Sequence, residues 1–251
     1  MLAAQGLTKL FGGVRGVDDA SFTVERGRIV GLIGPNGAGK TTLFNLVAGA
    51  IRPTSGTLAL EGRRLDGLPP ERIFRHGIGR TFQIPRPFAR MTVLENVMVG
   101  PIGQLGERFW ANWLSPGRVR AQERRLRERA MHWLGFLRLD ALADQPASSL
   151  SGGQRKLLEL ARVLMAEPAL ILLDEPAAGV NPALLDLIVD RIATLNRQGT
   201  TFLVIEHNMD VVMQLCDPVI CMAQGRILVE GPAEVIRSDP RVIESYLGHA
   251  A

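Results

Sequence analysis

The chain has 251 residues, of which 46% are hydrophobic and 22% charged, and its formal net charge is +4. This length allows one large α/β domain or two small ones, with ample core either way. Cys216 and Cys221 are too few for a disulfide framework and neither has a CxxC partner, so we expect a reducing cytoplasm. The pattern of a signal peptide is absent, as is a run of the ~18–20 apolar residues that span a bilayer. We therefore expect any membrane role to depend on a partner.

The positive net charge would suit an anionic partner, but basic residues are dense only between Arg118 and Arg129. Glu123 and Glu128 interrupt that segment. We interpret it as the solvated face of a helix rather than a nucleic-acid patch, and we expect no nucleic acid among the partners.

Two short strands and a loop aromatic come first in chain order. Residues 2–7 and 20–25 have the pattern of strands, the second with alternating hydrophobicity. Phe11 is expected in the loop between them, followed by Gly12-Gly13. A loop aromatic can stack on a nucleotide base, because every base offers a π-face. The alternative is a phenylalanine packed in a small satellite core.

A glycine-rich loop follows the next strand. Residues 28–33 are an apolar, β-branched run typical of a buried parallel strand, and apolar residues at helical spacing begin at Leu43. The loop between them fits the phosphate-loop pattern G-x-x-x-x-G-K-[ST], whose glycines let N–H groups turn inward at a helix N-terminus. Lys40 would reach the β- and γ-phosphates, and the Thr41 hydroxyl would ligate Mg²⁺. An ordinary glycine turn does not account for the match at every position. The candidate nucleotide-binding residues here are Gly34, Pro35, Asn36, Gly37, Ala38, Gly39, Lys40, Thr41 and Thr42.

Short elements lead from this loop to the middle of the chain. We predict a strand over 57–60, a short helix opened by Pro69-Pro70, and a strand over 78–82. The last strand delivers Gln83 into the loop 84–88, where two prolines forbid regular structure.

Residues 84–149 are expected to be mainly helical. Thr92 and Glu95 match a capping box at the start of a short helix. Residues 101–116 have no period and suggest an irregular connection, whereas 118–138 carry an apolar helical face. The segment interrupts the α/β rhythm, which predicts a helical subdomain inserted between two halves of the sheet.

The α/β pattern resumes with a second glycine-bearing loop, Leu150-Ser151-Gly152-Gly153-Gln154. Ser151 and Gln154 have capping-box spacing, and an apolar helical face follows them. A hydroxyl and N–H groups at a helix N-terminus can bind an anion. The alternative is simply a well-capped helix.

Residues 169–173 are an apolar run that ends in Asp174-Glu175, which describes a buried strand with two carboxylates at its C-terminal end. Ligands of doubly wound sheets bind beyond those ends. Asp174 would hold Mg²⁺, and Glu175 would orient and deprotonate the attacking water. The alternative is a capping Asp followed by a surface Glu.

The rest of the chain continues the alternation. Asn181-Pro182 opens a helix that Gly199 ends, and residues 200–205 form a strand that delivers His207. His207 could hydrogen-bond a γ-phosphate, although a lone His is otherwise more often structural. A hairpin over 218–222 and 226–230 and short helices over 232–237 and 240–247 are predicted last.

Together these motifs resemble those of ATP-binding-cassette (ABC) ATPases. The phosphate loop, Gln83, LSGGQ at 150–154, ILLDEP at 171–176 and His207 occur in that family's order and rough spacing, over essentially the whole chain. The resemblance implies ATP and Mg²⁺ as ligands. It also implies that Phe11 stacks on adenine, where the family commonly has Tyr, that Gln83 joins Mg²⁺ to the helical subdomain, and that His207 is the switch histidine.

The resemblance further implies a head-to-tail dimer with a second ABC ATPase subunit. In it, Ser151, Gly153 and Gln154 would bind the γ-phosphate held by the other subunit's Lys40. One departure stands out: the family's D-loop usually ends in Asp, whereas residues 178–181 end in Asn, which keeps the helix cap but loses the charge.

A finer resemblance is to the ATP-binding subunits of branched-chain amino acid importers. It rests on FGG at 11–13, RTFQ at 80–83, EPAAGVNP at 175–182, IEH at 205–207 and YLG at 246–248. Those subunits work with two membrane permeases and an extracytoplasmic solute-binding protein. We therefore expect a cytoplasmic ATPase, peripheral on the inner face of the membrane, that powers import. The alternatives are the ATPase of a lipid- or lipopolysaccharide-type exporter and a soluble ABC protein, although the latter usually carries two cassettes or a coiled-coil insertion.

The predicted fold is α/β: a P-loop NTPase core with a mainly parallel sheet, an antiparallel β N-terminal subdomain and an inserted α-helical subdomain. We expect a single ABC domain over 1–251. Its approximate subdomains are 1–83 with 150–251 for the nucleotide-binding core and β subdomain, and 84–149 for the helical one.

Overall fold

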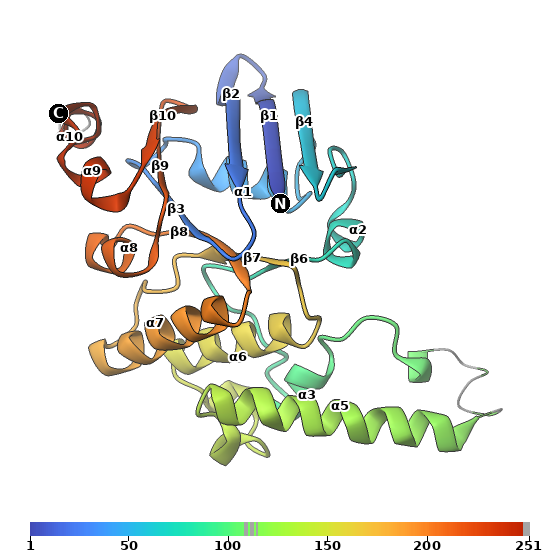
Figure 1. Cartoon of the computed structure of the whole chain (residues 1–251). Helices are drawn as coiled ribbons and strands as arrows, with labels where there is room; N and C mark the ends of the chain where they lie inside the picture. The colour runs from blue at the N-terminus through green and yellow to red at the C-terminus, as the bar shows by residue number, and fades with distance from the viewer. Residues whose placement is uncertain (108–109, 111–112, 114, 248–251) are drawn as a thin grey trace. The chain divides into compact units, whose positions relative to one another are not determined.

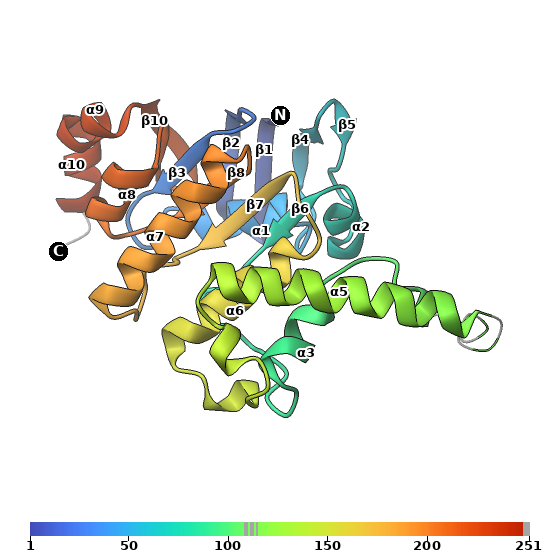
Figure 2. The same ribbon diagram turned by 60° about the horizontal axis from the view of Figure 1, so that its bottom comes forward.

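The computed structural model describes residues 1–107, 110, 113 and 115–247 (Figures 1 and 2). The chain divides into two compact units. The first, which we call the sheet unit, comprises Met1–Arg80, Ala169–Ala177 and Ile192–Ala251. The second, the helical unit, comprises Thr81–Pro168 and Ala178–Arg191. Each unit is therefore assembled from segments that are far apart in the sequence.

The larger sheet of the sheet unit has the strand order β10-β9-β3-β8-β7-β6. Its neighbouring strands pair in parallel, except that β10 pairs antiparallel with β9 in the predicted hairpin. The mainly parallel sheet predicted from the sequence is thus confirmed. Its strands are β3 (Ile29–Ile33), β6 (Ile78–Arg80), β7 (Leu170–Asp174), β8 (Thr201–Ile205), β9 (Val219–Ala223) and β10 (Arg226–Gly231).

The three central strands β3, β7 and β8 are buried along their whole length. Their near-continuous apolar sequences suit strands that are covered on both faces. Their register is parallel, and Ile205 of β8 pairs with both Leu32 of β3 and Asp174 of β7. The loops that follow these three strands therefore emerge at one edge of the sheet.

The smaller sheet is antiparallel, with the order β2-β1-β4-β5, and confirms the predicted β N-terminal subdomain. Strands β2, β1 and β4 of this sheet lie side by side in Figure 1. Its strands are β1 (Leu2–Phe11), β2 (Val14–Val24), β4 (Ser55–Leu60) and β5 (Arg63–Arg64).

The first two strands are longer than predicted, and the prediction that Phe11 lies in a loop is wrong. Phe11 is the last residue of β1 and pairs with Val14 of β2. Gly12-Gly13 forms a tight turn between them, with φ of +58° at Gly12. A two-residue turn with such a glycine lets the ladder continue to its end, so the strands extend past the apolar residues that define them in the sequence.

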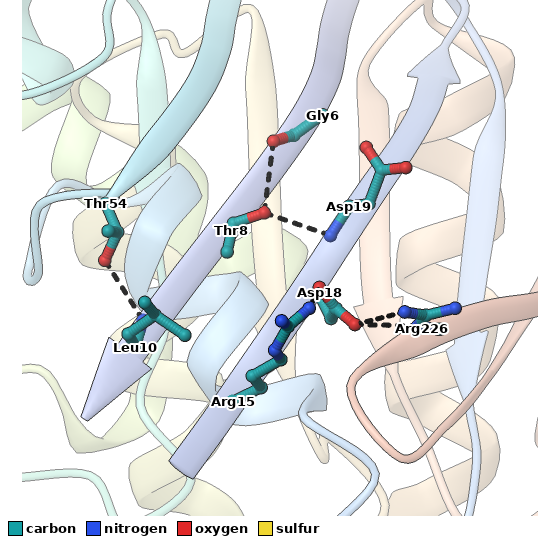
Figure 3. Close-up of polar contacts among 8 residues, drawn as sticks. All are labelled: Gly6, Thr8, Leu10, Arg15, Asp18, Asp19, Thr54 and Arg226. Carbon is teal, nitrogen blue, oxygen red and sulfur yellow. Dashed lines mark hydrogen bonds and ion pairs between the residues drawn. The ribbon is translucent and has the colours of Figure 1, made fainter. Parts of the chain in front are cut away.

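Threonine side chains keep the backbone of β1 hydrogen-bonded across irregularities in its register (Figure 3). The Thr8 hydroxyl accepts a hydrogen bond from the Asp19 N–H at 3.1 Å and donates one to the Gly6 carbonyl at 3.4 Å. The Thr54 hydroxyl accepts the Leu10 N–H at 3.0 Å. These bonds hold the end of β1 that carries Phe11.

The helices of the sheet unit flank these sheets. The core includes Leu43 and Phe44 of α1, packed with apolar side chains of both sheets. Asn208 caps α8, because its side-chain oxygen accepts the Asp210 and Val211 N–H groups. The helices are α1 (Lys40–Val47), α2 (Pro70–Arg75), α8 (Met209–Leu215), α9 (Ala233–Ser238) and α10 (Pro240–Leu247).

The helical unit is built on α3, α5 and α6, and α5 packs against both of the others (Figure 2). The predicted capping box of Thr92 and Glu95 opens α3. The predicted apolar face of α5 buries Leu126, Ala130 and Leu134. The helices are α3 (Val93–Met98), α5 (Pro116–Phe136) and α6 (Gly152–Leu164), with 3₁₀ turns at Leu105–Glu107, Asp140–Leu142 and Ala147–Ser149; α7 (Pro182–Arg197) begins here and ends in the sheet unit.

Two predictions touch the limits of the described residues. The irregular connection predicted over 101–116 contains the 3₁₀ turn at Leu105–Glu107, and residues 108, 109, 111, 112 and 114 lie outside the described part. Gly248 of the YLG segment also lies outside it. Across residues 1–107, 110, 113 and 115–247, no helix has both the length and the hydropathy needed to cross a membrane.

Candidate functional site

Three loops of the sheet unit meet where β3, β7 and β8 end. They begin at Gly34, Glu175 and Glu206, each directly after its strand. The carboxyl edge of a parallel sheet is where such folds bind ligands. The sequence places the phosphate loop, the paired carboxylates and His207 on these same three loops.

Glycines shape the phosphate loop. Gly34, Gly37 and Gly39 have φ of +146°, +77° and +100°. A Cβ on Gly34 would lie 2.2 Å from the Met222 carbonyl oxygen, and one on Gly39 would lie 2.5 Å from the Gly16 carbonyl oxygen. Other residues are therefore excluded at Gly34 and Gly39 both by conformation and by space. Helix α1 begins at Lys40, so the loop ends on a helix N-terminus that favours an anion.

Lys40 is poised at the mouth of this loop. Its side chain is buried, and Nζ donates hydrogen bonds to the carbonyl oxygens of Gly34 at 2.7 Å and Pro35 at 2.9 Å. Burial lowers the pKa of the ammonium group, and the nearby Glu175 carboxylate opposes that shift. An ammonium hydrogen-bonded to backbone carbonyls can exchange them for phosphate oxygens.

The turn of the β9–β10 hairpin is hydrogen-bonded to the phosphate loop and to β2. Figure 3 shows the ion pair between Arg226 of β10 and Asp18 of β2. The Asp18 carboxylate accepts hydrogen bonds from Arg226 Nε at 2.8 Å and Arg15 at 2.7 Å, and these bonds lower its pKa. The Asp18 N–H donates to the Gly225 carbonyl at 2.8 Å, and the Gly225 N–H donates to the Ala38 carbonyl at 3.0 Å. Strand β2, the hairpin turn and the phosphate loop are thus joined by backbone hydrogen bonds.

Asp174 and Arg80 form an ion pair in which both side chains are largely buried, with 3.1 Å between Nη2 and Oδ2. Arg80 also donates to the Asn45 side chain of α1 at 2.7 Å. The Asp174 carboxylate is therefore fixed in direction. Asp174 is the last residue of β7, and Thr41 lies in the first turn of α1, after the phosphate loop. A carboxylate and a hydroxyl oxygen are the kind of donors that Mg²⁺ prefers.

Glu175 and His207 contact each other. Nε2 of His207 donates to Oε1 of Glu175 at 3.0 Å. Glu175 has a φ of +49°, in the left-handed region that non-glycine residues rarely adopt. In a regular strand, consecutive side chains point to opposite faces of the sheet. The left-handed conformation of Glu175 ends this alternation, so Asp174 and Glu175 can both face the same side. Strain of this kind is characteristic of functional sites.

The Glu206 carboxylate hydrogen-bonds both the loop that follows Glu175 and the loop that carries His207. It is only 2% exposed, and its carboxylate accepts the N–H groups of Ala177 at 2.7 Å, His207 at 3.0 Å and Asn208 at 3.2 Å. A buried carboxylate needs such donors to offset its desolvation. Glu206 thereby fixes the backbone on both sides of the Glu175–His207 contact.

The Phe11 ring is not packed into a core, since it is 49% exposed. A Cβ on Gly16 would lie 2.8 Å from the Phe11 ring and 3.3 Å from the Thr42 methyl group. Lys9 Nζ lies 5.3 Å from the ring centroid. The ring thus borders the start of α1 and is about half exposed.

The second glycine-bearing loop lies in the helical unit and carries a complete capping box. The Ser151 hydroxyl accepts the Gln154 N–H at 3.3 Å, and the Gln154 side chain accepts the Ser151 N–H at 2.9 Å. A Cβ on Gly153 would lie 2.2 Å from Cδ2 of Leu184 of α7, so a larger residue there would displace that side chain. Asn181 keeps the predicted cap, because Oδ1 accepts the Leu184 N–H at 2.9 Å.

Gln83 also lies in the helical unit, in the exposed segment that follows Thr81. The strand predicted over 78–82 is shorter than expected, because β6 ends at Arg80. The buried Glu159 of α6 accepts the Phe82 N–H at 3.1 Å and holds the start of this segment. Burial raises the pKa of Glu159.

Sequence reasoning missed Arg80, Glu206 and Tyr246. All three lie inside segments that carry the finer resemblance, RTFQ at 80–83, IEH at 205–207 and YLG at 246–248, but the sequence alone assigns them no role. The partners of Arg80 and Glu206 are Asp174 and Ala177, which are 94 and 29 positions away. The Tyr246 hydroxyl accepts the Gly34 N–H across 212 positions. Membership of these segments is the signal that could have drawn attention to the three residues.

A parallel α/β sheet with a glycine phosphate loop, a lysine and paired strand-end carboxylates defines a P-loop nucleoside triphosphatase. Comparison with known proteins specifies the type. Residues 17–178 match the ABC transporter family, and residues 226–251 match the family described as branched-chain amino acid ATP-binding cassette transporter. The chain belongs to the ABC transporter family and is the ATP-hydrolysing subunit of a transporter.

Curated relatives match over nearly their whole length. The chain is 44% identical to the probable branched-chain amino acid transport ATP-binding protein LivG of Archaeoglobus fulgidus, covering 99% of this chain and 95% of that one. It is 42% identical to the high-affinity branched-chain amino acid transport ATP-binding protein BraF of Pseudomonas aeruginosa, covering 100% and 98%. A solved nucleotide-free ATP-binding cassette from an ABC transporter superposes with a TM-score of 0.84 at 37% identity, covering 98% of each chain. The predicted family and fold are confirmed, and the exporter alternative is not favoured.

Proposed function

We propose that this subunit binds and hydrolyses ATP to power the import of branched-chain amino acids through separate membrane permeases. The observation that carries the solute class is full-length identity of 42–44% to proteins named for that transport, together with the matching C-terminal family. The permeases would hold the chain on the inner face of the membrane. An extracytoplasmic binding protein would deliver the solute, which never touches this chain.

In this proposal the phosphate loop, residues 34–42, binds the triphosphate. Lys40 exchanges the Gly34 and Pro35 carbonyls for β- and γ-phosphate oxygens, and the N–H groups of the loop cradle the same anion. Phe11 supplies an exposed ring beside Thr42 on which adenine can stack.

The residues present fit Mg²⁺. Thr41 offers a hydroxyl and Asp174 a carboxylate directed by Arg80, and Gln83 would add an amide oxygen, as the resemblance to ABC ATPases implies. When bound, the ion would neutralise charge that develops on the phosphate oxygens.

The hydrolytic step is assigned to Glu175 and His207. Glu175 accepts a proton from a water molecule. The oxygen of that water attacks the γ-phosphorus as the bond from phosphorus to the β–γ bridging oxygen breaks. His207, 3.0 Å from Glu175, turns its Nε2–H to a γ-phosphate oxygen. Glu206 keeps both loops at the distance that this requires.

The working unit is a head-to-tail pair of such subunits. Ser151, Gly153 and Gln154 of one subunit would bind the γ-phosphate held by Lys40 of the other. Two anion-binding loops in one chain are then explained, because each composite site takes one loop from each subunit. The segment 84–100, which begins just after Gln83, would transmit closure and opening to a permease loop.

Reconstitution tests this proposal. The chain is co-expressed with the membrane proteins that co-purify with it, and the complex is placed in proteoliposomes with ATP and a binding protein. We expect ATP-dependent uptake of leucine, isoleucine or valine, and no uptake with Glu175→Gln in the same complex. ATP-dependent uptake confined to another solute class, or extrusion of lipid, would refute the assigned solute.

A further inference from the structure

The last turn of the C-terminal helix α10 reaches the phosphate loop. The Tyr246 hydroxyl oxygen accepts a hydrogen bond from the Gly34 N–H at 2.9 Å. Tyr246 is the single tyrosine among the 251 residues. None of the roles assigned above to the phosphate loop, the carboxylates or His207 uses this contact.

The Gly34 N–H needs this partner. Gly34 is buried, and the ladder between β3 and β8 ends at Leu32, two residues earlier. The Met222 carbonyl oxygen would lie 2.2 Å from a Cβ on this residue, so the backbone here is closely packed. A buried donor without an acceptor is costly, so the hydroxyl contributes directly to the conformation of this residue.

The same residue also contacts Lys40. The Gly34 carbonyl accepts the Lys40 ammonium at 2.7 Å, while its N–H donates to Tyr246. When Lys40 turns to a phosphate, the carbonyl loses that bond and the N–H keeps its own. Tyr246 is thus placed to hold the first residue of the loop in position while the lysine moves.

Helix α10 is anchored firmly enough to do this. Val242 is buried, and the Ser245 hydroxyl donates to the Val242 carbonyl at 2.7 Å and also hydrogen-bonds the buried Cys221 of β9. Asp239 caps the start of the helix through the Arg241 N–H at 2.9 Å. Burial raises the pKa of Tyr246, so its hydroxyl keeps its proton at neutral pH.

We propose that Tyr246 is a positioning residue of the nucleotide site: its hydroxyl fixes Gly34, and helix α10 is thereby a structural part of the phosphate loop. The inference rests on the proposed role of that loop in binding ATP. It predicts that loss of the hydroxyl weakens nucleotide binding without impairing hydrolysis once ATP is bound.

Tyr246→Phe tests this, because it removes the hydroxyl and keeps the ring. We expect the Kd for Mg-ATP and the KM to rise about fivefold to tenfold, which corresponds to the loss of one partly buried hydrogen bond. The kcat at saturating ATP should stay within about twofold, since Tyr246 touches neither Glu175 nor His207. Ser238→Ala is the control: it removes an exposed hydroxyl of the preceding helix α9 that hydrogen-bonds carbonyls of its own helix, and ATP affinity should not change. Wild-type affinity in Tyr246→Phe, or equal losses in both variants, would overturn the assignment.

The single tyrosine allows a second measurement on the unsubstituted chain. With ring-labelled [¹³Cζ]tyrosine the protein has one such resonance, and saturating Mg-ADP should shift it as Lys40 leaves the Gly34 carbonyl. Lys40→Ala, which should bind no nucleotide, provides the reference. If calorimetry shows that Mg-ADP binds to the wild type but the resonance does not move, Tyr246 does not respond to the phosphate loop. The inference about Tyr246 then fails, while the proposed function stands. If the wild type binds no nucleotide, the proposed function fails with it.

Discussion

Replacing Glu206 by Gln is the sharpest test of how the hydrolytic pair is held. The carboxylate accepts three backbone N–H groups, one through Oε1 from Ala177 and two through Oε2 from His207 and Asn208. Gln has the same shape but only one acceptor oxygen. In either orientation of the amide, its NH₂ group faces at least one backbone N–H.

The magnitude follows from this count. A hydrogen bond to a charged group contributes about 1.5–3 kcal/mol, and a buried donor left without a partner costs about 1–3 kcal/mol. The better orientation keeps the His207 and Asn208 bonds and loses only that of Ala177, so we expect the free energy of unfolding to fall by about 2 kcal/mol. The loop after Glu175 is then no longer fixed. Misplacement of a catalytic group by about 1 Å can cost on the order of 10²-fold, so kcat should fall about 10- to 100-fold.

Urea denaturation and steady-state ATPase assays measure the two effects, and nucleotide titration should give an unchanged Kd, because Lys40 and its loop are untouched. Glu128→Gln on the exposed face of α5 removes the same charge and should change neither quantity. If Glu206→Gln kept the wild-type midpoint and kcat, the claim that this carboxylate fixes the loop after Glu175 through the Ala177 N–H would be wrong.

Three further predictions follow from the described contacts. Ser151→Ala should lower the free energy of unfolding by about 1 kcal/mol and abolish ATP-dependent dimerisation on a sizing column, whereas Thr92→Ala, which breaks the same kind of capping box on α3, should have only the first effect. Glu175→Gln should accumulate as an ATP-bound dimer, and hydrolysis at the wild-type rate would refute its role as general base. Burial raises the pKa of Glu159 in the folded state, so ionisation of this carboxyl destabilises the fold above that pKa. The destabilisation disappears as the pH falls to the pKa that the group has in the unfolded chain. Glu159→Gln should therefore be the more stable protein at pH 7, and its advantage in urea denaturation should shrink as the pH approaches 4.5.

Much of the fold follows from local sequence patterns. The apolar runs of β3, β7 and β8 identify strands buried on both faces, and parallel pairing then requires their loops to share one edge. The starts of α3 and α6 are also predictable from the sequence, because the two residues of a capping box are only three positions apart. These residues are Thr92 with Glu95 and Ser151 with Gln154.

The missed features depend on contacts between distant segments. Phe11 was expected in a loop because Gly12-Gly13 follows it, yet pairing with Val14 extends the strand to that residue. Arg80 directs Asp174, and Glu206 fixes Ala177, through partners that no local period reveals. Such side chains can be assigned only after the topology brings their strands together.

The choice of residue at the second anion-binding loop has a physical reason. The capping box of α6 uses the N–H groups of Ser151 and Gln154, so it leaves those of Gly152 and Gly153 outside its two hydrogen bonds. The Ser151 hydroxyl accepts in the cap, and a hydroxyl can donate its own proton at the same time. Aspartate caps a helix about as well as serine, but it has no proton to donate at neutral pH and would repel a phosphate. A serine at this position can therefore stabilise α6 and bind a γ-phosphate together. The Leu184 side chain of α7 packs against Gly153, so a larger residue at this turn would have to displace it.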